Sequence, residues 1–171
     1  MEVYIRNKWV SLGGSSVVKD VNENDVLKVK GKIFTFTRKK FVCDMQDNPL
    51  YIVRNKFWTL FVKKAFILDK DGNQLALIKR KFFSVHDRYF IESSLGSFEI
   101  IGNILGFDYH IKKDGVEIGH ISRKISLRDS FVLSVPDDVD LPFYVAFVIA
   151  IDNITDRRRD DSSVSFSSSN D

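Results

Sequence analysis

A short pattern recurs along this 171-residue chain at nearly constant spacing. Each copy reads apolar, basic, variable, lysine, apolar, except that Ser122 holds the basic position of the last copy. The lysines of the five copies are Lys8, Lys32, Lys56, Lys81 and Lys124. The first three steps are 24, 24 and 25 residues, and the last is 43, which leaves room for one degenerate copy around residues 98–114. Such a period indicates one small supersecondary unit used repeatedly.

The repeated unit has the features of a β-hairpin. After each lysine come an aromatic or apolar residue, a short basic loop, a second strand, a polar turn and a returning strand. Asp71-Gly72 and Asp114-Gly115 favour tight turns, because glycine accepts the positive φ that such turns require. Strands are predicted at Phe41–Asp44, Leu50–Val53, Ala65–Asp69, Gln74–Ile78 and Tyr89–Glu92. The pattern predicts an antiparallel meander and leaves strand order and closure open.

Composition agrees with a single β domain. The chain holds 15 Phe, 5 Tyr, 2 Trp and only 3 Pro, and aromatic residues suit a half-buried pleated surface. With 44% hydrophobic and 29% charged residues, it resembles ordinary globular proteins and is long enough to bury a core. The single cysteine, Cys43, forms no intrachain disulfide, and no signal-peptide pattern opens the sequence. We therefore expect a reduced, cytoplasmic setting.

One segment breaks the hairpin pattern, because Leu141–Ile151 is apolar on every face. It is too short to cross a bilayer as a helix, which needs about 20 residues, and long for a strand. Asp137, Asp138 and Asp140 precede it and residues 157–159 are arginines, which suits the two ends of a helix dipole. We predict a helix buried on all sides that fills the core, in preference to a membrane insert.

The end of the chain has a different character. Six of the last ten residues are serine, and no hydrophobic periodicity remains. Such a segment cannot bury enough apolar surface to offset its ordering entropy. We predict one barrel domain over residues 1–154 and a disordered Ser/Asp-rich tail over residues 155–171.

Several stretches carry a family resemblance that spans roughly residues 3–154. They are Lys56-Phe57, Lys81 to Val85, Ile104 to Ile111, Ile118 to Lys124, Asp129 to Leu133 and Ala146 to Asp152. The third is similar to a Leu-Gly-His-Asp-Tyr signature, with Phe107 in place of the histidine. In this order the stretches resemble the LURP-one-related family, whose bacterial branch is often called YxjI-like, within the tubby C-terminal-like fold. The stretch after Lys124 is one residue shorter than the family's usual spacing. This difference affects the prediction of a local bulge or loop at that point, and not the prediction of the fold.

The resemblance implies a mainly β fold, a closed antiparallel barrel of about twelve strands around the buried C-terminal helix. It also implies lipid as a partner, since tubby-type relatives bind phosphoinositides and phospholipid scramblases are grouped with the same fold. Through the scramblases it suggests a calcium loop at Asp137, Asp138 and Asp140. Helix capping explains these three aspartates with fewer assumptions, because calcium requires six to eight oxygen ligands.

Residue types that carry catalysis do not fall into a catalytic pattern. His110 and His120 flank the second Asp-Gly turn, but a two-histidine metal site needs a carboxylate or cysteine in register, and none is evident. His86 and Asp87 are neighbours, so on a strand they point to opposite faces. Cys43 is expected to be buried and unreactive. We predict no enzyme activity, no catalytic residue, no metal and no cofactor.

The basic residues of the repeat suggest a binding surface. Within four copies two basic residues lie two positions apart, so they face the same side of a strand. Recurring once per repeat, they are predicted to form a basic belt that attracts anionic phospholipid head groups. The predicted belt is Arg6, Lys8, Lys30, Lys32, Arg54, Lys56, Lys79, Lys81 and Lys124. A plainer interpretation is that lysines cover the solvated face, and the near balance of 26 basic and 23 acidic residues favours it.

The leading hypothesis is a non-enzymatic binding module that contacts anionic membrane lipid or a protein partner, as a cytoplasmic monomer that binds peripherally. A second is a structural or adaptor protein without a lipid role, which uses the tail for recognition. A third is a carrier of a small ligand near the barrel mouth. Nucleic acid is not expected as a partner, because the aromatic residues alternate into the core and form no exposed stacking platform.

Overall fold

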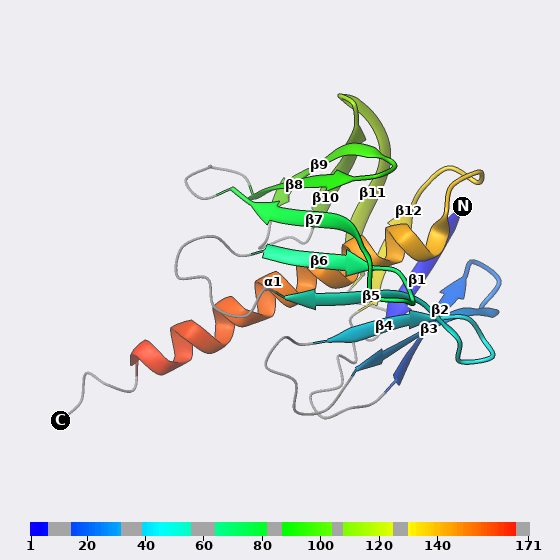
Figure 1. Ribbon diagram of the computed structural model, residues 1–171, viewed down its shortest axis with the longest axis horizontal. Helices are drawn as coiled ribbons and strands as arrows, with labels where there is room; N and C mark the ends of the chain where they lie inside the picture. Colours follow the sequence, from blue (N-terminus) through cyan, green and yellow to red (C-terminus); the bar gives the residue numbers. More distant parts are fainter. Residues whose placement is uncertain are drawn as a thin grey trace.

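A computed structural model describes residues 1–6, 15–31, 39–55, 64–81, 87–103, 108–124 and 130–166, with only the backbone described at Arg6, Ser15 and residues 156–166. Within these ranges the chain forms twelve strands and one helix (Figure 1). They are β1 (Glu2–Arg6), β2 (Ser15–Asp20), β3 (Asp25–Gly31), β4 (Lys40–Cys43), β5 (Pro49–Asn55), β6 (Lys64–Leu68), β7 (Gln74–Arg80), β8 (Asp87–Ser93), β9 (Gly96–Asn103), β10 (Asp108–Lys113), β11 (Val116–Lys124), β12 (Ser130–Ser134) and α1 (Leu141–Phe166).

The strands form a closed antiparallel barrel. Each strand pairs with its neighbours in sequence, and β1 pairs with β12 to close the sheet, with Ile5 opposite Phe131. Closure removes every free sheet edge among these strands. The predicted strands and both Asp-Gly turns are confirmed, and so is the mainly β barrel of about twelve strands around a C-terminal helix.

The barrel has two distinct ends. Because neighbouring strands are antiparallel, all odd-numbered strands run in one direction. We call "turn end" the end at which short turns lead from β2, β4, β6, β8 and β10 into the following odd strands. We call "exit end" the opposite end, where the odd strands finish and α1 leaves the barrel (Figure 1). Asn55 at the end of β5 donates its amide to the carbonyl of Asn153, at 3.1 Å, which places that part of α1 at the exit end.

Three hairpins share one turn structure, which was not recognised in the sequence. Asp20, Asp44 and Asp69 each accept hydrogen bonds from the backbone N–H groups two and four residues later, and from the asparagine side chain four residues later. The residue three positions after each aspartate has a positive φ, at 65° to 91°. The spacing Asp-x-x-x-Asn at 24- and 25-residue steps is the signal that identifies it. This asparagine bond holds the pKa of each aspartate below its ordinary value of 3.8.

Acid should therefore weaken the barrel through these turns. A carboxylate with a lowered folded-state pKa stabilises the fold above its ordinary pKa, and that stability is lost as the pH falls through the folded value. Changing Asn24, Asn48 and Asn73 together to alanine should lower stability at neutral pH and reduce the further loss at about pH 3. Urea denaturation at both pH values measures this, and an acid-induced loss equal to that of the unmodified chain would contradict it.

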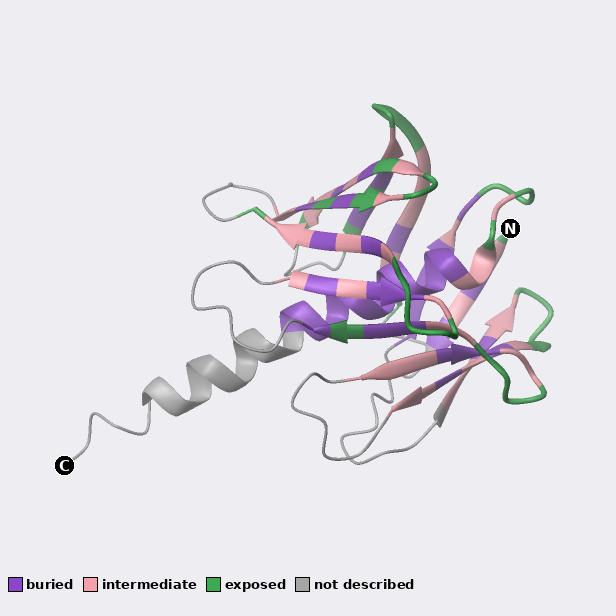
Figure 2. Ribbon diagram, in the orientation of Figure 1, coloured by how far each residue is buried: buried purple, intermediate pink, exposed green. Residues whose placement is uncertain are grey.

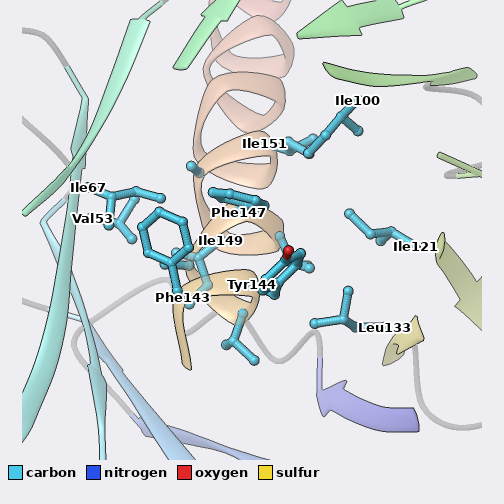
Figure 3. Packing of buried hydrophobic residues seen from close by; sticks show 14 of the residues in the cluster. Val53, Ile67, Ile100, Ile121, Leu133, Phe143, Tyr144, Phe147, Ile149 and Ile151 are labelled. Carbon is cyan, nitrogen blue, oxygen red and sulfur yellow. The ribbon is translucent and has the colours of Figure 1, made fainter. Parts of the chain in front are cut away.

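The core is made by α1 and the inward-facing residues of every strand. Each residue from Phe143 to Thr155 is buried, so the helix is covered on all sides (Figure 2). Val53, Ile67, Ile100 and Ile121 point at it from four different strands (Figure 3). Strand residues alternate accordingly, as in β8, where Tyr89 and Ile91 are buried and Phe90 and Glu92 are exposed. The prediction of a fully buried helix is confirmed.

The helix is longer than the eleven residues predicted from its apolar run, because the helical backbone extends to Phe166. Polar side chains form contacts at the place where the helix leaves the barrel. Lys40 lies 3.4 Å from the buried Asp152, and Thr155 donates its hydroxyl to the carbonyl of Ile151 at 2.8 Å. Within the described residues no helix has the length and apolar character needed to span a bilayer. The division into residues 1–154 and a disordered tail over 155–171 stays a prediction.

Candidate functional site

The described members of the predicted basic belt all belong to the exit end. Arg6 and Lys124 are the last residues of β1 and β11, and Lys81 directly follows β7. Lys30, Arg54 and Lys79 each occupy the position next to the end of β3, β5 and β7. Lys8, Lys32 and Lys56 lie outside the described residues. Because adjacent strands are about 4.8 Å apart, residues on alternate strands form a ring around this end, with spacings of roughly 10 Å.

Contacts within the chain divide this ring into two groups. The ammonium groups of Lys30 and Lys79 reach back along the wall to carboxylates, at 3.0 Å from Asp47 and 2.7 Å from Glu92. Arg54, Lys81 and Lys124 are exposed, and Arg54 and Lys124 each contact an aromatic ring. The guanidinium of Arg54 lies 5.4 Å from the Phe66 ring centre and the Lys124 ammonium 5.6 Å from that of Tyr4. Cation–π contacts at exposed sites contribute only about 0.5–1 kcal/mol each and leave the charges accessible.

Further basic residues reach the same end, although the sequence analysis did not assign them to a site. They belong to the starts of even strands or the last residues of odd ones, and are Lys39, Lys40, Lys64, Arg80, Arg88 and Arg123. In the sequence these residues belong to strand ends or to the short basic loops of the repeat, and the loops were interpreted only as connections between strands. Some have acidic partners: Arg80 forms an ion pair with Asp87, and Arg88 lies 3.2 Å from Glu99.

The turn end is mainly acidic, although Lys19, Lys70, Lys112 and Lys113 also lie there. Its acidic residues are Asp20, Glu23, Asp25, Asp44, Asp47, Asp69, Asp71, Asp114, Asp137, Asp138 and Asp140. The cause is turn chemistry, because aspartate and asparagine stabilise tight turns by bonding to nearby backbone groups. The short turns therefore concentrate aspartates at one end, and most lysines and arginines of the strands lie at the other, together with Asp87, Asp108 and Asp152. This separation is invisible in the net charge of +3.

Two of the three aspartates before α1, Asp137 and Asp140, have structural partners. Asp140 caps the helix, because its Oδ1 accepts the N–H of Phe143 at 3.3 Å and its Oδ2 accepts the hydroxyl of Tyr51. Burial is the main cause that raises the pKa of Tyr51, followed by its bond to Asp140. Asp137 lies 2.5 Å from the N-terminal ammonium of Met1. These contacts support the capping interpretation of the segment.

Two other sequence expectations concern reactive residues. Cys43 is buried as predicted, and burial raises the pKa of its thiol, so it is a poor nucleophile at neutral pH. His110 and His120 lie on paired strands as the turn suggested, directly opposite each other. The carboxylate that was not evident from the sequence is Asp108, whose Oδ1 is hydrogen-bonded to Nε2 of His120. His86 lies outside the described residues.

Comparisons with known proteins give one match. The family model described as LURP-one-related matches residues 1–152, which include all twelve strands and the buried part of the helix up to Asp152. Neither the curated proteins nor the solved structures include a match.

Proposed function

Because this chain belongs to the LURP-one-related family, with a match that spans the whole barrel, we propose a non-enzymatic module that binds anionic phospholipid head groups through its exit end. The observation that carries this proposal is the unequal distribution of charge, with an excess of basic residues around the exit end and of acidic residues around the turn end. The family resemblance to phosphoinositide-binding tubby-type proteins agrees with it. The module would act in the cytoplasm and associate peripherally with a membrane.

On the side of β5 and β7 the two ends of the barrel are far apart, whereas beside the four-residue β4 Lys30 of the exit end reaches Asp47 of the turn end. A seven-residue strand such as β5 or β7 spans about 23 Å, whereas electrostatic screening at physiological salt has a length of about 8 Å. A membrane in contact with the exit end therefore attracts the lysines and arginines there and hardly affects the aspartates at the far end. Beyond the barrel, residues 156–161 hold three aspartates and three arginines, so this part of α1 adds no net charge.

The filled interior also supports binding on the outside. The helix supplies Phe143, Tyr144 and Phe147 to the centre of the barrel, where their rings contact one another and Phe98 at centroid distances of 4.9–6.5 Å. Small-ligand carriers of this shape keep a cavity within the barrel. A core occupied by the protein's own helix weighs against the carrier hypothesis.

Vesicle flotation tests the proposal. We expect the chain to bind vesicles of mixed phosphatidylcholine and phosphatidylserine at low salt, and not vesicles of phosphatidylcholine alone. Each basic residue near an anionic surface contributes about 1 kcal/mol, so the double variant Lys81→Gln and Lys124→Gln should bind about 30-fold more weakly.

The matched control removes the same charge from the turn end, as Lys19→Gln and Lys70→Gln, and should bind like the unmodified chain. If both double variants lose affinity equally, the exit end has no special role. If neither vesicle type is bound at low salt, the lipid proposal fails and a protein partner becomes the better hypothesis.

A further inference from the structure

Three side chains of the metal-binding types converge on the outer face of the β10–β11 hairpin. His110 and His120 lie directly opposite each other across the two strands, with ring centroids 5.1 Å apart. Asp108 precedes His110 by two residues on β10, so it faces the same side. One nitrogen or oxygen atom from each of these three side chains lies within 4.8 Å of the other two.

A fourth side chain orients the cluster. Glu117 accepts a hydrogen bond from Nδ1 of His110 at 2.9 Å, and this bond is the main cause that lowers the pKa of Glu117. Glu117 and His120 are three residues apart and would lie on opposite faces of a regular strand. The register shift between Ile111 and Lys112 adds one residue to β11, which brings Glu117 to the outer face.

The cluster departs from the repeat that shapes the rest of the barrel. In the β6–β7 hairpin, Phe66 and Leu77 face each other across the strands with their neighbours on both sides buried. They hold an outward cross-strand position of the kind that His110 and His120 hold in β10–β11. Duplication of one hairpin therefore does not account for two histidines and two carboxylates at this place.

We propose that Asp108, His110 and His120 bind a divalent transition metal ion, and Zn²⁺ is the ion whose chemistry fits best. Two imidazoles and one carboxylate are a donor set typical of zinc, whereas calcium and magnesium require oxygen ligands. Zinc imposes little geometry of its own, and three protein ligands leave its fourth position to water. Because Glu117 occupies Nδ1 of His110, Nε2 is the nitrogen left for the metal.

The geometry requires only local adjustment. Tetrahedral zinc with bonds of about 2.0–2.1 Å needs donor atoms roughly 3.4 Å apart. The three donor atoms lie within 4.8 Å of one another, so they have to approach by at most about 1.4 Å. His110 and Asp108 are exposed and His120 is half-buried, so these side chains can rotate without moving the core. Asp108 and Glu117 bring two negative charges near the ion, against one positive charge on the nearby Lys112.

Calorimetric titration of ZnCl₂ into the chain, purified without a histidine tag, tests the proposal. We expect saturable binding of one ion per chain. The variants His110→Ala and His120→Ala should each abolish it. The variant Glu117→Gln removes an orienting partner and should weaken it by about 10- to 100-fold. His86→Ala, which changes the third histidine of the chain, is the matched control and should bind like the unmodified chain.

Two further measurements keep the outcome decisive. Circular dichroism checks that each variant is folded, and Asp108→Asn, which keeps the side-chain shape, replaces any alanine variant that is not. Substitution by Co²⁺ should give the absorption of nitrogen and oxygen ligands without a thiolate band, which excludes Cys43. Absence of binding, or binding that survives loss of both His110 and His120, would overturn the site.

Discussion

Replacing Phe147 with alanine is expected to lower the free energy of unfolding by about 3–5 kcal/mol. Phe147 is completely buried. The centroid of its ring lies 4.9 Å from the ring centroid of Phe143, 5.2 Å from that of Phe98 and 5.3 Å from that of Tyr144. Truncation opens a cavity at the axis of a closed barrel, where hydrogen-bonded strands on every side limit collapse. Since domains of this size are stable by only about 5–15 kcal/mol, such a loss removes a large part of the total stability.

Urea denaturation measures this loss, and Phe90→Ala is the matched control. Phe90 is the same residue type on β8, but its side chain points outward and is 37% exposed. The control should cost less than about 1 kcal/mol, as surface substitutions generally do. Similar losses for the two variants would mean that the aromatic contacts around α1 do not hold the barrel together.

Replacing Gly102 with alanine is expected to cost about 3 kcal/mol or more, at the upper end of overpacking effects. Gly102 lies opposite Tyr109 in the pairing of β9 with β10. A Cβ atom at this position would lie 1.9 Å from the carbonyl oxygen of Asp108 and 2.6 Å from Cδ1 of Tyr109. Backbone is the nearer obstacle and Tyr109 is fully buried, so the two strands have to separate locally.

Thermal unfolding followed by circular dichroism checks this second prediction, with Gly115→Asn as the control. Gly115 has a φ of 86° in the β10–β11 turn, and a Cβ there meets nothing within 4 Å. Asparagine tolerates positive φ better than other side chains, so the control should lower the melting temperature much less. If the two variants have equal melting temperatures, the close approach at Gly102 is relieved by a shift that costs little.

The sequence predicted the local elements, but it did not predict features that depend on how residues far apart in the chain are arranged in space. The lysine repeat and the Asp-Gly turns predicted the hairpins, and the apolar run from Leu141 predicted the buried helix. Closure of β1 on β12 came only from family resemblance, because the pairing joins residues more than 120 positions apart. The helical backbone beyond Ile151 was missed since hydrophobicity ends there while the polar contacts of Asp152 and Thr155 continue.

The candidate sites show the same limit. The unequal distribution of charge depends on strand direction. Basic residues near the ends of odd strands and the starts of even strands meet at one end of the barrel, and the aspartates of the short turns meet at the other. The histidine pair could be anticipated from its turn. Asp108 stands two positions before His110, and this spacing, which places both side chains on one face of a strand, was the signal that could have identified it. Glu117 could not be anticipated, because its place depends on one extra residue in β11.

The central claim is that the exit end faces an anionic membrane, and the orientation of bound protein tests it most directly. Ser94 in the β8–β9 turn and Asn103 at the end of β9 mark the two ends of the barrel along one strand. Each is changed to cysteine in a Cys43→Ala background and labelled with a fluorophore whose emission shifts to the blue in contact with lipid. With vesicles that contain phosphatidylserine, the blue shift should occur at Asn103→Cys and not at Ser94→Cys. An equal shift at both positions, or a shift only at Ser94→Cys, would contradict the claim.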